Sequence, residues 1–262
     1  MSDAGEQDTS GGSNPVELDP SFLNAAEQRM RESFMGDVGR EVELVDIACA
    51  LLVHALSRVG GRRVTIEVGE AGEFLRAPDP NEVILGACTL IGTRALGVIR
   101  AARAVLASGF EGEARALDRI LVELLAHRRA ILNDQTGEEA VAWMRRERTR
   151  GISKRVAAMG EPELYANLST DSHGDPAPLL RLMDLDDKSI DMAPRRTAAT
   201  GASLLMYAGF ARDQAVLLAK LSGAVEITGI EELDSAMNNA WDQLGADASE
   251  EGTTTEAPPE ST

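Results

Sequence analysis

Apolar residues recur at helical spacing along most of this 262-residue chain, so the pattern predicts a protein built from long helices. Residues 41–59 and 81–108 each place apolar side chains on one side, three or four positions apart. Residues 195–222 form a third long segment that is rich in alanine. The segments at 41–59 and 195–222 are expected to flank the segment at 81–108 and the helix that follows it.

Glycine and proline mark where these helices begin and end. Gly36 and Gly39 are expected to separate a first helix, residues 21–35, from the helix at 41–59. Only a short glycine-containing turn separates residues 81–108 from a further helix at 111–133. This pair is therefore expected to form an antiparallel hairpin at the centre of the protein.

The helix at 111–133 carries a polar stripe on the face opposite its leucines. Arg119, Glu123 and His127 lie four residues apart among alanines, so they are neighbours on one side of the helix. We expect this helix to be enclosed in the bundle, with the stripe facing protein rather than water. Two interpretations are open: an ion pair that fixes helix register, or Glu123 orienting His127 as a general base.

Alternating residues give a single strand signal, at residues 63–76, which predicts one small β-hairpin. Shorter helices are expected at 138–150, 152–159 and 230–244. The glycines inside the helix at 81–108 indicate either close approach of a neighbouring helix or a local bend; they are Gly86, Gly92 and Gly97.

Together these elements predict an all-α fold, a single multi-helix bundle at residues 21–245 with the hairpin at one end. Residues 1–20 and 246–262 are polar, with ten acidic and no basic residues, and are expected to be disordered acidic tails. The chain carries a formal net charge of -17, which disfavours general nucleic-acid binding.

Two cysteines, Cys49 and Cys88, lie in apolar helical patterns and are expected to be buried reduced thiols, typical of a cytoplasmic protein. The polar N-terminus does not resemble a signal peptide, and we expect no membrane span, since the longest apolar stretch is 201–211. No cofactor and no metal site are expected, because nucleotide-binding and metal-ligand motifs are missing.

One basic run interrupts the acidic chain, and it is interpreted as a solvated helix face or as a local contact with an anion or RNA backbone. Its residues are Arg145, Arg146, Arg148, Arg150, Lys154 and Arg155.

A second candidate group is Tyr165, Ser169 and His173, which would share a face if the helix before them continued that far. The composition after residue 170 is that of a loop, so His173 is alternatively a surface residue in a loop that caps the next helix.

The run from Phe110 to Glu123, with the Tyr165–Ser169 segment and His173, resembles a bacterial all-helical family of unknown function. The resemblance covers residues 81–183 and rests on an "EA…LxRxLxE" helix followed by a "YxxLS…H" segment. It implies that Arg119, Glu123, Tyr165, Ser169 and His173 meet in space.

No strong catalytic motif is present, so whether the chain is an enzyme stays open. We expect a non-enzymatic binding, regulatory or structural module that acts through an unknown protein partner or by self-association. The alternative is an RNase-like or other phosphodiester hydrolase that uses His173 or His127 with Arg119.

Overall fold

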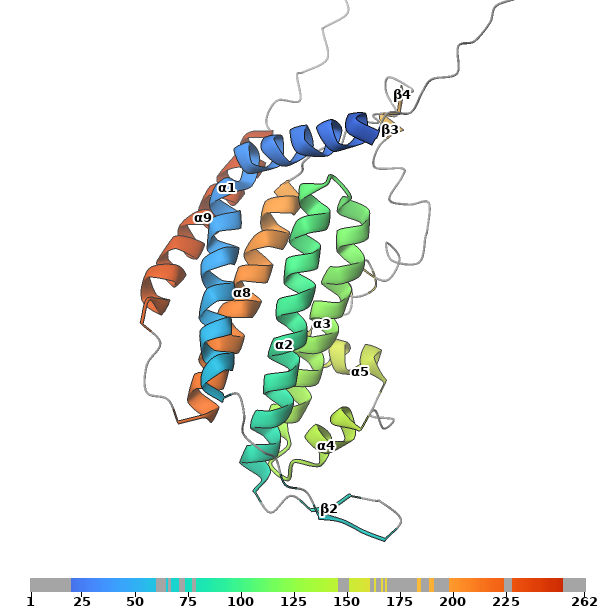
Figure 1. The fold of residues 1–262 in the computed structure, drawn as a ribbon, viewed down its shortest axis with the longest axis vertical. Coiled ribbons are helices and arrows are strands. Elements are labelled where there is room, and N and C mark those ends of the chain that lie inside the picture. The colour runs from blue at the N-terminus through green and yellow to red at the C-terminus, as the bar shows by residue number, and fades with distance from the viewer. Residues whose placement is uncertain are drawn as a thin grey trace, which may run out of the picture.

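A computed structural model gives the chain as a bundle of long helices, which confirms the predicted all-α fold (Figure 1). It describes residues 20–251 except 60–64, 66, 71–73, 77–78, 146–150, 161–162, 164–165, 167, 169–182, 185–188, 191–197 and 224–227. The helices in this part are α1 (Pro20–Val59), α2 (Pro80–Ala107), α3 (Glu111–Asn133), α4 (Glu138–Met144), α5 (Ile152–Ala157), α8 (Ala198–Leu221) and α9 (Ile230–Glu251).

The two helices predicted on either side of Gly36 and Gly39 form one element, α1, with a kink at Val38 instead of a break. Val38 has non-helical backbone angles, with φ -132° and ψ 27°. The buried side chains Phe34, Val38 and Val42 continue the apolar stripe across the glycines, four residues apart. Packing of this stripe keeps both halves of α1 against the bundle, while the kink redirects the first half across its end (Figure 1).

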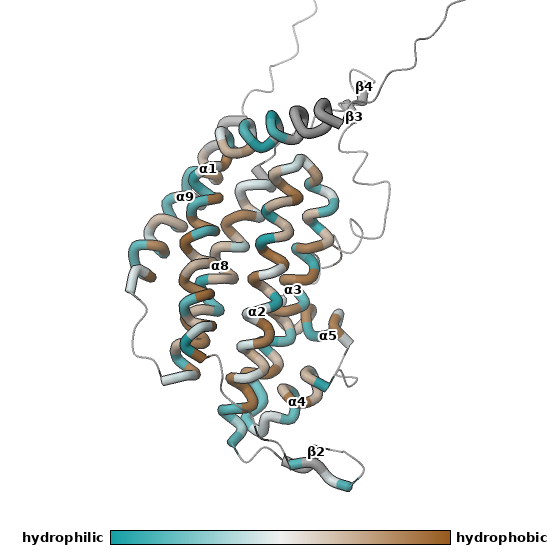
Figure 2. The backbone as a smooth tube through the Cα atoms, viewed as in Figure 1, coloured by the Kyte–Doolittle hydropathy of each residue, from teal (hydrophilic) through white to brown (hydrophobic). Residues whose placement is uncertain are grey.

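Helix α8 is the most enclosed helix of the bundle, in place of the predicted central helix α3. Its buried residues come in neighbouring pairs that point in different directions around the axis, such as Leu204 with Leu205 and Tyr207 with Ala208. It packs against α1, α2 and α9, and Figure 1 shows it behind the space between α1 and α2. The apolar colouring of α8 and α2 in Figure 2 agrees with their inner positions.

Helices α2 and α3 form the predicted antiparallel hairpin, and α3 has the predicted bounds Glu111–Asn133. The close approach expected at the glycines of α2 occurs at Gly92. A Cβ atom there would lie 3.2 Å from Cγ of Gln214 on α8 and 3.4 Å from Cδ2 of Leu56 on α1. Around Gly97 no atom of the described residues would lie within 4 Å, so close packing does not explain that glycine.

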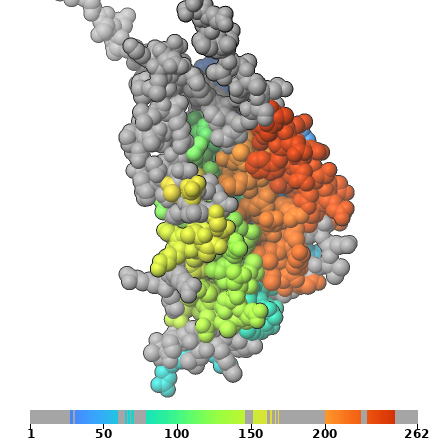
Figure 3. Space-filling view, turned by 180° about the vertical axis from the view of Figure 1, so that it is seen from behind, coloured from blue at the N-terminus to red at the C-terminus, as the bar shows by residue number. Residues whose placement is uncertain are grey.

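The smaller elements cover the outside of the bundle. Helix α4 ends at Met144, earlier than the predicted Arg150, and residues 146–150 lie outside the described part. Helix α5 lies on α3 through Val156 on one side and the pair Val122 and Ala126 on the other. Figure 3, seen from behind, shows α4 and α5 over α3, with α8 and α9 beside them.

Helix α9 continues to Glu251, past Leu244 where the sequence pattern predicted its end. The first residues of the segment expected to be a disordered C-terminal tail are therefore helical. The remainder of that segment, and residues 1–19, lie outside the described part.

The predicted β-hairpin is present as antiparallel strands β1 (Glu67–Val68) and β2 (Phe74–Arg76). A second small antiparallel pair, β3 (Met183–Asp184) with β4 (Ser189–Ile190), was not predicted, because residues 179–183 resemble a brief apolar turn in the sequence. Both hairpins lie outside the helical core.

By length and composition, α2 is the one helix in the described part of the chain that could cross a membrane. Half of its most apolar stretch is buried within the bundle, as in the core helix of a globular domain. Residues 201–211, the longest apolar stretch in the sequence, belong to α8.

The start of α2 gives a first testable prediction, because one side chain caps it. The Asp79 carboxylate accepts hydrogen bonds from the backbone N–H groups of Asn81 and Glu82, at 3.0 and 3.4 Å. Replacing Asp79 by alanine leaves both donors without this acceptor, and we expect the free energy of unfolding to fall by about 1 kcal/mol. Urea unfolding measures the loss, and Asp79→Asn, which keeps a capping oxygen, should retain most of the stability.

Candidate functional site

A buried carboxylate on α3 forms the first polar cluster of the core. Asp118 is 4% exposed and accepts hydrogen bonds from two hydroxyl groups of α8, those of Tyr207 and Ser203. Tyr207 is completely buried, and the Ser203 oxygen lies 3.4 Å from the carboxylate. These contacts tie α3 to α8 through the interior of the bundle.

Burial raises the pKa of Asp118 above its usual value, although the hydrogen bonds from Tyr207 and Ser203 act in the opposite direction. The same burial, together with the Asp118 charge, holds the pKa of Tyr207 far above that of a free phenol. A carboxyl with a raised pKa beside two hydroxyl groups suits proton transfer. Here both carboxylate oxygens are occupied and the group is closed off from solvent, so the cluster acts as a structural link.

A second polar cluster lies further along the same two helices. Gln214 of α8, which is fully buried, donates to the backbone carbonyl of Cys88 on α2 at 2.8 Å. Its side-chain oxygen accepts a hydrogen bond from Arg128 of α3 at 3.0 Å. The Arg128 guanidinium also lies 5.1 Å from the centre of the Phe210 ring, a cation–π distance. One amide therefore connects three helices.

The predicted stripe on α3 is half-buried, not enclosed as expected. The Arg119 guanidinium bonds to the Glu123 carboxylate at 3.1 Å, and their side chains are 25% and 29% exposed. The buried charge of α3 is Asp118, on the leucine face. The geometry of Arg119 and Glu123 favours the ion-pair interpretation over the general-base one.

His127 lies in a tight, partly apolar environment between α3, α4 and α5. Its ring centre is 6.1 Å from that of Trp143, and no described residue bonds to its buried Nδ1 atom. Burial lowers the pKa of His127, and Arg155 lowers it further, while Glu123 and Glu139 oppose them. The imidazole is therefore neutral at neutral pH. In an oriented general base, a hydrogen bond to one ring nitrogen holds the imidazole in one tautomer. The Nδ1 atom of His127 lacks such a bond to any described residue.

The described residues of the basic run differ in their exposure to solvent. Arg145 and Lys154 are exposed, whereas Arg155 is 7% exposed and bonds to the Glu139 carboxylate at 2.7 Å. Arg155 is thus an internal ion-pair partner and not part of a solvated basic face. The remaining members, Arg146, Arg148 and Arg150, lie outside the described residues.

Three further candidates, Tyr165, Ser169 and His173, also lie outside the described residues. Their predicted convergence with Arg119 and Glu123 stays a prediction. In the described part of the chain, no three His, Cys, Asp or Glu side chains are grouped so that they could hold a metal ion.

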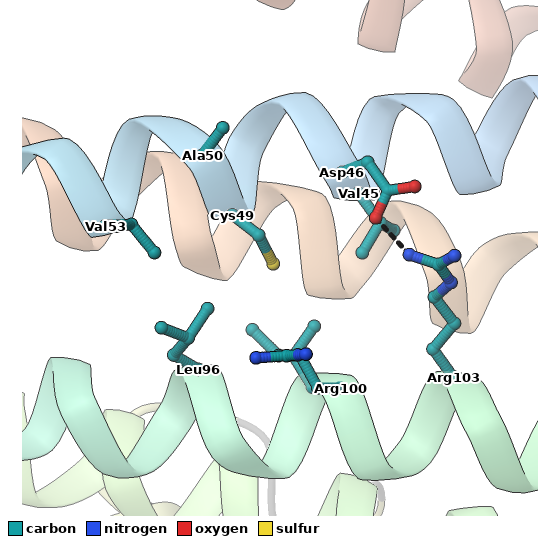
Figure 4. Close-up of a pocket in the computed structure, with 9 residues that line it drawn as sticks. Val45, Asp46, Cys49, Ala50, Val53, Leu96, Arg100 and Arg103 are labelled. Atoms are coloured by element: carbon teal, nitrogen blue, oxygen red, sulfur yellow. Dashed lines mark hydrogen bonds and ion pairs between the residues drawn. The ribbon is translucent and has the colours of Figure 1, made fainter.

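Sequence reasoning missed a groove between α1 and α2, which encloses about 290 Å³ (Figure 4). Its lining is mostly aliphatic, with three charged side chains among it. The lining residues are Val45, Asp46, Cys49, Ala50, Val53, Leu96, Ile99, Arg100 and Arg103.

The polar side chains of the groove include one bridge between its walls. Arg103 on α2 pairs with Asp46 on α1, as the dashed line in Figure 4 shows. Cys49 lies on the α1 wall and is half-buried, in contrast to the full burial predicted for both cysteines. Burial, with the nearby Asp46 charge, raises the pKa of the Cys49 thiol to about 11. Cys88 is buried as predicted.

In comparisons with known proteins, no family model, no curated protein and no solved structure matches the chain. The resemblance to a bacterial helical family therefore stays a prediction. The geometry described above is the basis for assigning a function.

The Asp118 cluster predicts a specific pH dependence of stability. The pKa of Asp118 is higher in the folded protein than in the unfolded chain, where it is about 3.9. The folded state therefore binds more protons than the unfolded chain at pH values between the two pKa values of Asp118. As pH rises from the unfolded-state pKa through the folded-state pKa, the contribution of Asp118 to stability falls. Asp118→Asn removes the ionisation, so its stability should rise relative to the natural protein between pH 3 and pH 7.

Urea unfolding of both proteins at matched pH values measures this difference and cancels the effect of the other acidic groups. Tyr207→Phe is the companion variant: it removes one donor from the buried carboxylate and should cost about 1–3 kcal/mol. A stability difference between Asp118→Asn and the natural protein that stays constant with pH would contradict the raised pKa.

A comparison of two arginines tests which ion pair matters for the fold. Arg119→Ala breaks a half-exposed pair on one helix and should cost about 0.3–0.5 kcal/mol. Arg155→Ala removes a buried guanidinium that joins α5 to α4 through Glu139, and should cost about 1–3 kcal/mol, since Glu139 is itself partly exposed. If urea unfolding gave equal losses of stability for the two variants, burial would not determine how much each ion pair contributes.

Proposed function

We propose that this chain is a non-enzymatic binding protein whose ligand site is the groove between α1 and α2. The observation that carries the proposal is the combination of a concave aliphatic lining with charged groups among it. Ligand sites in proteins commonly have this composition, and a volume of about 290 Å³ suits a small ligand.

The groove lacks the groups that catalysis would need. Its only carboxylate, Asp46, is engaged by Arg103. Its thiol, Cys49, has a pKa of about 11, so it is protonated at neutral pH and a poor nucleophile. None of the residues that line the groove is a histidine, serine or tyrosine. These features support binding without chemical conversion.

The aliphatic wall of the groove also gives a reason for a ligand to bind. Val53 keeps 49% of its surface exposed on the α1 wall, and Leu96 stands opposite on α2 (Figure 4). Covering such side chains is favourable by about 25 cal/mol for each Å² removed from water. A ligand with an apolar part would therefore gain free energy at this end of the groove.

The proposal is tested with three eight-carbon probes that differ in charge: octanoate, octanol and octylamine. Binding is measured by ligand-observed NMR and placed on the protein by amide chemical shifts. We expect at least one probe to bind and to shift amides of the groove residues. Val53→Trp should abolish this binding, because the Val53 side chain points toward α2 and an indole there would occupy the groove (Figure 4).

Ile47→Trp is the matched control, since Ile47 is also an exposed β-branched residue of α1 but does not line the groove. It should bind the probes like the natural protein. The proposal fails if none of the probes binds, or if Val53→Trp binds them as well as Ile47→Trp does.

A further inference from the structure

The charged and apolar side chains of the groove are separated along its length. Asp46 and Arg103 bridge the two helices at one end, and Ala50, Val53 and Leu96 lie toward the other (Figure 4). This polarity would align a ligand that has a charged head and an aliphatic tail.

Arg100 lies between these two ends and supplies an uncompensated positive charge. Figure 4 shows its guanidinium beneath Cys49, between Leu96 and Arg103. Among the described residues Arg100 has no ion-pair partner, whereas the charge of Arg103 is balanced by Asp46. The charged lining therefore sums to one positive charge, located on a side chain that can form two parallel hydrogen bonds to a carboxylate.

We infer that the groove binds a short amphipathic monocarboxylate, with its head on Arg100 and its tail along Cys49, Val53 and Leu96. The inference rests on the proposed function and adds the class of ligand. A cationic head would be repelled by Arg100, and the one carboxylate among the lining residues, Asp46, is already paired with Arg103. A single free guanidinium favours a head with a single negative charge.

The volume of the groove sets the length of the tail. At roughly 30 Å³ for each water-sized group, the groove has room for about ten non-hydrogen atoms. Octanoate has this size. Carboxylates with shorter tails would leave part of the aliphatic wall uncovered.

Isothermal titration of the natural protein with octanoate, octanol and octylamine tests the inference. We expect octanoate to bind about tenfold more tightly than octanol, the difference that one charge-assisted contact provides, and octylamine to bind most weakly. In Arg100→Gln, octanoate and octanol should bind with similar affinity, because the carboxylate head has lost its charged partner.

Arg94→Gln is the control, because Arg94 is an exposed arginine of the same helix that does not line the groove. It should retain the tenfold preference. Equal binding of octanoate and octanol, or an equal loss of octanoate binding in Arg94→Gln and Arg100→Gln, would overturn the inference. If octanol binds the natural protein and Val53→Trp abolishes that binding, the groove is still supported as a ligand site, so the two failures are distinguishable.

Discussion

The bundle depends on hydrogen bonds that cross its interior from α3 to α8. Asp118 with Tyr207, and Arg128 with Gln214, join two helices whose backbones make few close contacts with each other. Gln214 extends the second link to α2 through the carbonyl of Cys88. Polar groups buried so deeply are costly unless they are paired, so each pair restricts these helices to one register and one rotation about their axes. This constraint specifies the fold more strictly than apolar contact alone.

The position of α8 also accounts for the groove. Gly92 lets Gln214 approach α2 closely, so α8 sits behind the space between α1 and α2 and packs on both. Along the front of α1 and α2, the Asp46–Arg103 pair bridges the two helices and mostly aliphatic side chains line the space between them. A concave strip results, and its lining comes from residues that would be ordinary surface positions on either helix alone.

Apolar periodicity was sufficient to predict the helices, and it located α3 to the residue because short glycine turns mark its start. It failed at Gly36 and Gly39, where the packing of Phe34, Val38 and Val42 outweighs two poor helix formers. Asp118 was missed although it interrupts the leucine face of α3, a visible sign of a buried charge. The groove could not be predicted, since it depends on the distance between two helices, which no local pattern encodes.

The two thiols of the chain are unequal in position but similar in chemistry. Cys88 is enclosed by the core and Cys49 faces the groove, yet the pKa of each is raised to about 11. Oxidants and alkylating agents attack the thiolate, which at neutral pH makes up only about one part in ten thousand of such a group. Peroxide should therefore oxidise the sulfur at the groove wall more slowly than an ordinary exposed thiol.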